Sequence, residues 1–387
     1  MNRFPSVPFG AFWLWLRRLG NSIYSALILR LYWQFRPSPI KRDGILGLIG
    51  NTPMIELISL SNITGCRILA KLEYMNPSGS PKDRIVMHFF NNLVKDRILS
   101  PPGSSPEAMN RNTSVEIVEG STGSTGISLA CISRKFNSKC TIFMPSDQSP
   151  EKQKWMRLFG ARVVVTPPAS FIDPEHYSKQ AESYAKLPSQ TTRIFFDQFE
   201  NLNNNVTANY ESTAPEIWSQ AAGNISAIVF SAGGSGTVVG VSKYLKEQRP
   251  DIKVFLAGPQ HSGVHSCVNT GVSFPSEGQE GARSKHQVGS AVQDVEINRL
   301  GSIVAEIPRL VDDYIKINDS EVIEMATFLL PNVLGLFVGS SSALNLAAVV
   351  KAARKLPKGS VIVTILSDSG YGRWSPPSND ESKFQPK

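Results

Sequence analysis

From Ile45 onward, short apolar or β-branched runs alternate with longer amphipathic stretches. Short runs of this kind are typical of strands, and apolar residues three or four positions apart are typical of helices. Strands that alternate with helices predict an α/β fold, in which parallel sheets carry helices on both faces. The expected strands are 67–72, 115–118, 140–144, 162–166, 227–231, 253–257 and 360–366. The expected helices are 83–95, 126–136, 151–159, 237–248, 320–330 and 342–355.

Two stretches interrupt this alternation, at 100–114 and 261–286, and both are rich in Pro, Gly or Ser. Such stretches are either surface insertions or covers over a site. The sequence leaves both interpretations open.

Residues 1–36 have a different pattern, with apolar runs at 9–16 and 23–35 that Arg17, Arg18 and Arg30 interrupt. An acid-free, Arg-bearing amphipathic start fits a mitochondrial presequence. The aromatic residues fit a membrane anchor, although no charge-free stretch reaches about 18 residues. A terminal helix packed on its own domain is the third interpretation. We expect a mitochondrial protein, with anchoring in the outer membrane as one form of that location.

The net charge of +8 could suggest a nucleic-acid partner, but its position argues against one. Residues 1–42 hold seven basic side chains and no acidic one, so the remainder of the chain is near +1. We therefore expect no binding to nucleic acid. The four cysteines form no Cys-x-x-Cys pair and show no metal-ligand spacing with the histidines, so no metal site is expected.

Residues 76–84 read Asn-Pro-Ser-Gly-Ser-Pro-Lys-Asp-Arg and lead into a predicted helix. Ser80 can accept from backbone N–H groups as an N-cap, and Pro81 suits the first helical position. Lys82 is then expected in the first turn, beside the partial positive charge of the helix start. An amine there should lose proton affinity, which favours Schiff-base chemistry. A solvated surface lysine is the alternative.

Residues 119–126 read Glu-Gly-Ser-Thr-Gly-Ser-Thr-Gly and connect a predicted strand to a predicted helix. Hydroxyl groups and backbone N–H groups at a helix start form a seat for a carboxylate or phosphate. A plain strand-to-helix turn is the alternative, which four hydroxyl groups in this segment disfavour.

Residues 231–237 read Ser-Ala-Gly-Gly-Ser-Gly-Thr and also follow a predicted strand. The glycines permit a close backbone approach, and the helix start and Thr237 favour a phosphate. The loop lacks the Gly-Lys-Ser/Thr ending of an ATP-binding loop and the spacing of a dinucleotide fingerprint. Two further hydroxyl-rich segments, 339–342 and 366–370, lie at a helix start and at a strand end, where ligands of open α/β sheets bind.

These five segments, in this order, resemble the cysteine synthase and cystathionine β-synthase family, which belongs to the fold type II pyridoxal-phosphate enzymes. Leu48-Ile-Gly-Asn-Thr-Pro53 resembles the opening motif of the family, and Met144-Pro145, Gly160-Ala161 and Asp197-Gln198-Phe199 are also family-like. The resemblance covers about residues 40–375. With its leader, the chain is most similar to fungal mitochondrial cysteine synthase-like proteins.

The resemblance implies a role for each matched residue. Lys82 would carry pyridoxal 5′-phosphate covalently and act as the catalytic base. Ser124 would lie beside the 3′-oxygen of the cofactor, and Ser341 would face its pyridine nitrogen. The phosphate would be held by Gly233, Gly234, Ser235, Gly236 and Thr237. The substrate carboxylate would be bound by Ser121, Thr122, Thr125 and Gln198.

The resemblance also implies architecture and activity. The expected fold is two open, twisted, mostly parallel sheets, as in the tryptophan synthase β-like enzymes. A targeting or anchor segment (1–36) would precede a larger cofactor-binding domain (37–84 and 196–375), a smaller substrate-closing domain (85–195) and a tail (376–387). The expected reaction replaces the β-substituent of O-acetyl-L-serine with sulfide to give L-cysteine, in a homodimer. Cystathionine formation, deamination of serine or threonine, and a weakly active membrane-anchored binding protein are the alternatives.

Three residues depart from the family pattern. Ser124 stands where the family has Asn, Pro81 where a small aliphatic residue is usual, and Ala343 where Gly is usual. These departures concern substrate choice and rate more than cofactor binding.

Overall fold

The computed structural model describes residues 44–169, 173–231, 233, 235–259, 265, 268, 292, 302–333 and 336–370. The chain divides into Met1–Gly44 and Ile45–Lys387. The first unit lies almost wholly outside the described residues. The leader segment 1–36, the tail 376–387 and most of the loop 261–286 therefore lie outside them as well.

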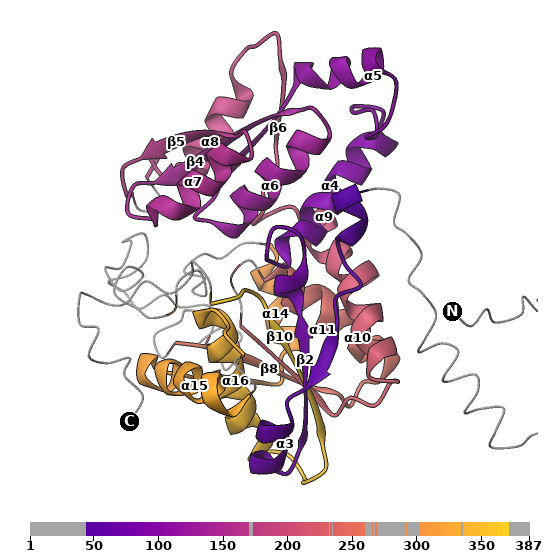
Figure 1. The fold of residues 1–387 in the computed structure, drawn as a ribbon, viewed down its shortest axis with the longest axis vertical. Helices are drawn as coiled ribbons and strands as arrows, with labels where there is room; N and C mark the ends of the chain where they lie inside the picture. Colours follow the sequence, from indigo (N-terminus) through magenta and orange to yellow (C-terminus); the bar gives the residue numbers. More distant parts are fainter. Residues whose placement is uncertain are drawn as a thin grey trace, which may run out of the picture. The chain divides into compact units, whose positions relative to one another are not determined.

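The larger sheet has six strands in the order β1-β2-β10-β7-β8-β9. All neighbouring strands are parallel except β1, which pairs with β2 in the antiparallel direction. The strands span Met54–Glu56 (β1), Arg67–Leu72 (β2), Ala227–Ser231 (β7), Lys253–Gly258 (β8), Asp313–Lys316 (β9) and Val361–Leu366 (β10). Its helices are α3 (Ile58–Thr64), α9 (Leu202–Ala208), α10 (Ala214–Gln220), α11 (Gly236–Gln248), α14 (Ile307–Leu310), α15 (Asp319–Asn332) and α16 (Ser340–Ala353). Figure 1 shows β2, β8 and β10 of this sheet, with α15 and α16 on one side and α10 and α11 on the other.

The smaller sheet has four parallel strands in the order β5-β4-β3-β6. They span Val115–Gly120 (β3), Lys139–Pro145 (β4), Arg162–Thr166 (β5) and Thr192–Phe195 (β6). The helices that accompany them are α4 (Lys82–Lys95), α5 (Pro106–Arg111), α6 (Ser124–Lys135), α7 (Pro150–Leu158) and α8 (Tyr177–Lys186).

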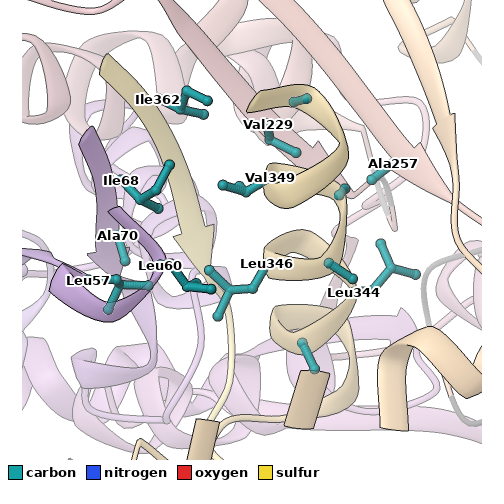
Figure 2. Packing of buried hydrophobic residues seen from close by; sticks show 14 of the residues in the cluster. Leu57, Leu60, Ile68, Ala70, Val229, Ala257, Leu344, Leu346, Val349 and Ile362 are labelled. Atoms are coloured by element: carbon teal, nitrogen blue, oxygen red, sulfur yellow. The ribbon is translucent and has the colours of Figure 1, made fainter. Parts of the chain in front are cut away.

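Helices cover both faces of the larger sheet. Successive side chains of a strand point to opposite faces, so each strand contributes apolar residues to both layers. On one face, Ile68 and Ile362 pack against Leu346 and Val349 of α16, as Figure 2 shows. On the other face, strand residues such as Val363 pack with residues of α10 and α11. The smaller sheet is likewise packed on both faces, by α4, α6 and α7 on one side and by α8 on the other. The expected α/β class with two mostly parallel sheets is confirmed.

Some details differ from the expectation. The stretch 100–114 contains the helix α5 and is not a plain loop. Three short strands, β1, β6 and β9, were not expected, because runs of three or four residues carry too little periodicity to be recognised. The domain boundaries stay a prediction. Within the described residues, no helix is both long enough and apolar enough to cross a bilayer.

Candidate active site

Three of the segments singled out in the sequence lie at one edge of the larger sheet. Strands β2, β10 and β7 are neighbours and run parallel, so their carboxyl ends meet at the same edge. The segment that ends in Lys82 follows β2, the segment around Asp368 follows β10, and the glycine-rich loop follows β7. Ligands of open α/β sheets bind at this kind of edge.

Lys82 is the first residue of α4 and is half-buried. The hydroxyl oxygen of Ser80 accepts from the backbone N–H of Lys82 at 3.2 Å. The sequence predicted Ser80 at the N-cap and Pro81 at the first helical position. In the structure Pro81 occupies the N-cap position, so both residues lie one position earlier relative to the helix than predicted. Lys82 thus lies at the helix start, as expected.

The turn before Lys82 is held by the buried carboxylate of Asp83. This carboxylate accepts from the backbone N–H of Ser78 at 2.8 Å and also from the Ser78 hydroxyl. The Ser78 hydroxyl lies 2.8 Å from that of Ser128 on α6. Burial raises the pKa of Asp83, and the hydrogen bonds from Ser78 oppose this rise. The chain of three polar side chains connects the Lys82 turn to the helix that follows the hydroxyl-rich loop.

A buried ionic network lies behind the same turn. Arg84 donates to both oxygens of Glu73, at 2.7 and 2.8 Å, and to Glu216 of α10 at 2.8 Å. Lys71, which is fully buried on β2, donates to Glu216 at 2.6 Å and to the backbone oxygen of Thr52 at 2.7 Å. This network joins the opening motif, β2, α4 and α10 into one support for Lys82.

The hydroxyl-rich loop between β3 and α6 is capped by one of its own side chains. The hydroxyl oxygen of Ser121 accepts from the backbone N–H groups of Gly123 at 3.2 Å and Gly126 at 3.0 Å. Ser121 and Thr125 are buried, whereas Thr122 and Ser124 are half-buried. The loop therefore begins α6 with hydroxyl groups and N–H groups together, as an anion seat requires.

The structure brings Thr125 and Gln198 into direct contact. The Thr125 hydroxyl donates to Oε1 of Gln198 at 2.6 Å. Nε2 of Gln198 donates to the backbone oxygen of Gly120 at 2.8 Å and to Oε1 of Glu119 at 3.1 Å. Two residues assigned to the substrate carboxylate from the sequence are thus neighbours, although 73 positions separate them.

The glycine-rich loop fits a phosphate. Ser235 adopts a left-handed conformation, with φ at 58°, directly before α11. Its hydroxyl is buried and has no hydrogen-bond partner among the described residues, so a donor is left for a ligand. A Cβ at Gly236 would lie 2.9 Å from the backbone oxygen of Asn205, which explains why glycine is needed there. Gly233 and Thr237 are half-buried, and Gly234 lies outside the described residues.

Ser341 lies in the first turn of α16, opposite the end of β10. Its hydroxyl donates to Oδ1 of Asp368 at 2.9 Å, and the hydroxyl of Ser342 lies 3.1 Å from the same oxygen. The backbone N–H of Gly339 donates to the Asp368 carbonyl oxygen at 3.0 Å. A carboxylate at a helix start is favoured by the helix dipole. Asp368 therefore fixes the direction of the Ser341 hydroxyl.

Sequence reasoning assigned no role to Glu119, Asp83 or Asp368. All three were inside segments that had been singled out for their hydroxyls, glycines or lysine. Their positions in the sequence could have identified them, because a carboxylate that is buried at a strand end or a helix start needs hydrogen-bond donors around it.

Comparison with known proteins agrees with this geometry. The family model described as "Pyridoxal-phosphate dependent enzyme" matches residues 45–368. "Cysteine synthase 2" of Schizosaccharomyces pombe is 39% identical over 93% of this chain and 91% of its own length. A Saccharomyces cerevisiae protein, provisionally named a mitochondrial cysteine synthase, is 38% identical over 87% of this chain and 84% of its own length.

The chain belongs to the cysteine synthase group of pyridoxal-phosphate-dependent enzymes. Its cofactor is pyridoxal phosphate. The buried hydroxyl of Ser235, which has no hydrogen-bond partner in the part of the chain that the structure describes, fits the phosphate of that cofactor. "Cystathionine beta-synthase" of Apis mellifera is a more distant relative, 33% identical over 84% of this chain but only 59% of its own length.

Solved structures give the same fold. A hydrogen sulfide-producing enzyme from Fusobacterium nucleatum matches with a TM-score of 0.69 and 27% identity, over 86% of this chain and 99% of that one. O-ureido-L-serine synthase matches with a TM-score of 0.70 and 23% identity, over 86% and 93% of the two chains, which supports the fold alone. The fold is that of the fold type II pyridoxal-phosphate enzymes.

Proposed function

We propose that this enzyme makes L-cysteine from O-acetyl-L-serine and sulfide. The observation that carries the proposal is the likeness to proteins named cysteine synthase, at 38–40% identity over 85–93% of the chain. The relative named cystathionine beta-synthase is less similar, at 33%.

The residues of the candidate site have distinct tasks in this reaction. When bound, pyridoxal phosphate supplies the electron sink for the negative charge that forms at the α-carbon. Lys82 would hold the cofactor through its Nζ and, as a free amine, would take the α-proton of the substrate. Ser121, Thr122, Thr125 and Gln198 bind the substrate carboxylate and so orient the α-carbon.

The loop after β7 would hold the phosphate, through Gly233, Gly234, Ser235, Gly236 and Thr237. Ser124 would lie beside the 3′-oxygen of the cofactor. Ser341, whose hydroxyl donates to Asp368, would face the pyridine nitrogen. Each of these assignments carries the family motif onto the matching position of this chain.

Sulfide is favoured as the second substrate because it needs no polar seat. Homocysteine brings a second carboxylate and ammonium group, which would need a second set of buried partners. Among the described residues, the hydroxyl groups at the starts of α11 and α16 are assigned to the cofactor, which leaves those at the start of α6 for one carboxylate. A site that holds a single amino-acid head therefore suits sulfide.

The role of Lys82 is tested by reduction with borohydride. Wild-type protein should be yellow and should trap the cofactor covalently, whereas Lys82→Ala should bind it without a trappable link. Trapping at another lysine in the variant would refute the assignment.

The choice of substrate is tested by steady-state kinetics. We expect a higher kcat/KM for sulfide with O-acetyl-L-serine than for homocysteine with serine. A preference for the homocysteine pair by about tenfold, or ~1.4 kcal/mol of transition-state stabilisation, would refute the proposal in favour of cystathionine formation.

We further propose that the protein is mitochondrial, in line with the provisional name of the Saccharomyces cerevisiae relative, and that it forms a homodimer. A fluorescent fusion of residues 1–42 should co-fractionate with mitochondria, and a diffuse cytosolic signal would contradict this. Carbonate extraction then separates a membrane-anchored protein from a soluble one, and sedimentation equilibrium gives the oligomeric state.

A further inference from the structure

The amide of Gln198 has all its hydrogen atoms in use. Nε2 donates to the backbone oxygen of Gly120 and to Glu119, and Oε1 accepts from Thr125. A carbonyl oxygen can only accept, so the oxygen of Gly120 fixes which end of the amide is the nitrogen. In this arrangement neither an amide N–H of Gln198 nor the hydroxyl hydrogen of Thr125 is available to a carboxylate.

Glu119 holds this arrangement from the end of β3. Its side chain is fully buried. Oε1 accepts from Gln198, and Oε2 accepts from the backbone N–H of Asp197 at 2.8 Å. Asp197 has a φ of 55° and forms the sharp turn after β6 that carries Gln198. One carboxylate therefore fixes both the turn and the amide.

We propose that Glu119 is a positioning residue that holds the side-chain amide of Gln198 through the hydrogen bond from Nε2 to Oε1, which we call the latch. An amino-acid substrate breaks this hydrogen bond when its carboxylate accepts the N–H of Gln198 instead. This inference rests on the proposed role of Gln198 in substrate binding. On release, one N–H of Gln198 moves from Glu119 to the substrate carboxylate, and the Thr125 hydroxyl turns to the same group. The bond to Gly120 persists as the pivot.

The two bonds of Nε2 indicate which one breaks. The bond to Glu119 is the longer, at 3.1 Å against 2.8 Å for Gly120, and its acceptor is a side chain that can adjust. Release leaves a buried oxygen of the Glu119 carboxyl group with one donor fewer, which is unfavourable. Only a ligand that accepts from both Gln198 and Thr125 compensates for this loss. The latch thus selects amino acids over amines that lack a carboxylate.

The experiment measures the dissociation constant of L-alanine from the holoenzyme, by absorption titration and by calorimetry. L-alanine has the α-carboxylate but no β-leaving group, so binding is separated from turnover. Glu119→Gln keeps one acceptor for Asp197 but removes the acceptor of the Gln198 N–H. We expect L-alanine to bind about two- to tenfold more tightly, the range that one released hydrogen bond produces. Gln198→Ala should bind it more weakly, because the donor itself is lost.

Glu116→Gln is the matched control. Glu116 is buried on the same strand, but it accepts from Thr141 at 2.6 Å and from Arg193 at 3.0 Å rather than from Gln198. Its substitution should leave the L-alanine dissociation constant unchanged. If Glu119→Gln binds L-alanine as wild type does, or more weakly, Glu119 does not latch Gln198.

A second measurement needs no variant. In a crystal structure of the wild-type holoenzyme with L-alanine, Nε2 of Gln198 should contact the carboxylate and lie beyond 3.5 Å, the hydrogen-bond limit, from Oε1 of Glu119. A Gln198–Glu119 bond that persists beside bound L-alanine would overturn the latch alone. A wild-type holoenzyme that binds no L-alanine would overturn the proposed substrate site as well.

Discussion

Carboxyl groups support the candidate site at two places, and their partners differ in charge. Behind Lys82, Glu73 and Glu216 accept from the cations of Arg84 and Lys71 at 2.6–2.8 Å. Beside the substrate loop, Glu119 accepts only from neutral amide groups among the described residues. Both arrangements satisfy the oxygens, but only the first one compensates the charge.

The pKa values show the consequence of this difference. Burial alone would raise the pKa of Glu216, but the hydrogen bonds and charges of Arg84 and Lys71 outweigh it and lower that pKa to about 2. Burial and the charge of Asp197 together raise the pKa of Glu119 to about 8, against the opposing hydrogen bonds. The first group is a fixed ionic support, whereas Glu119 has no cation among the described residues to compensate its charge.

The largest loss of stability is expected when Arg84, the cation that Glu73 and Glu216 share, is removed. Arg84→Met leaves Glu73, which is fully buried, without its guanidinium partner. We expect the free energy of unfolding of the holoenzyme to fall by about 3–5 kcal/mol, the usual cost of an unpaired buried charge. Urea denaturation followed by fluorescence measures it. Arg84→Lys should lose less, because it keeps the charge but not the two-pronged geometry. An Arg84→Met protein within about 1 kcal/mol of wild type would show that the network is not a support.

The regular parts of the larger sheet could be predicted from the sequence. Strands β2 and β7 have the predicted bounds, and α11 begins one residue before its predicted start. Long apolar or β-branched runs beside glycine-rich loops leave few other structures open. The motifs placed Lys82, the hydroxyl loop and the glycine loop correctly at helix starts.

The ionic support could not be predicted in the same way. Lys71 and Glu216 are 145 positions apart, and no local pattern relates them. One signal was present, since Lys71 interrupts an apolar run that forms a strand between two neighbours. A lysine in such a buried strand needs a buried partner. The identity of that partner depends on how α10 packs, which only the fold determines.

The pH dependence of stability tests whether Glu119, unlike Glu216, keeps its proton in the folded state. The expected effect is smaller than that of removing Arg84. The pKa of Glu119 is raised to about 8 in the folded state, so the folded protein keeps a proton that the unfolded chain has released. Stability is then fully present below the unfolded pKa and is lost as pH rises towards 8. Between pH 6 and pH 7, the contribution of Glu119 should fall by about 1.4 kcal/mol.

This contribution is isolated by comparing wild type with Glu119→Gln at both pH values, since all other titrating groups are shared. The difference between their free energies of unfolding should shift by that amount in favour of the variant at the higher pH. A difference that stays constant would mean that Glu119 is ionised throughout, as Glu216 is.

The smallest expected effect concerns an ion pair of the same length on the surface. Nε of Arg67 lies 2.8 Å from Glu56, nearly the 2.7 Å that separates Arg84 from Glu73, but the Arg67 and Glu56 side chains are 53% and 36% exposed. Water solvates both groups when the pair breaks, so Arg67→Met should change the free energy of unfolding by less than about 1 kcal/mol. The change should shrink further at high salt, which screens exposed charges.

Equal losses for Arg67→Met and Arg84→Met would mean that burial does not distinguish the two pairs. A several-fold larger loss for Arg84→Met, at nearly equal distances, would show that the missing solvent, and not the length of the contact, makes the ionic support behind Lys82 strong.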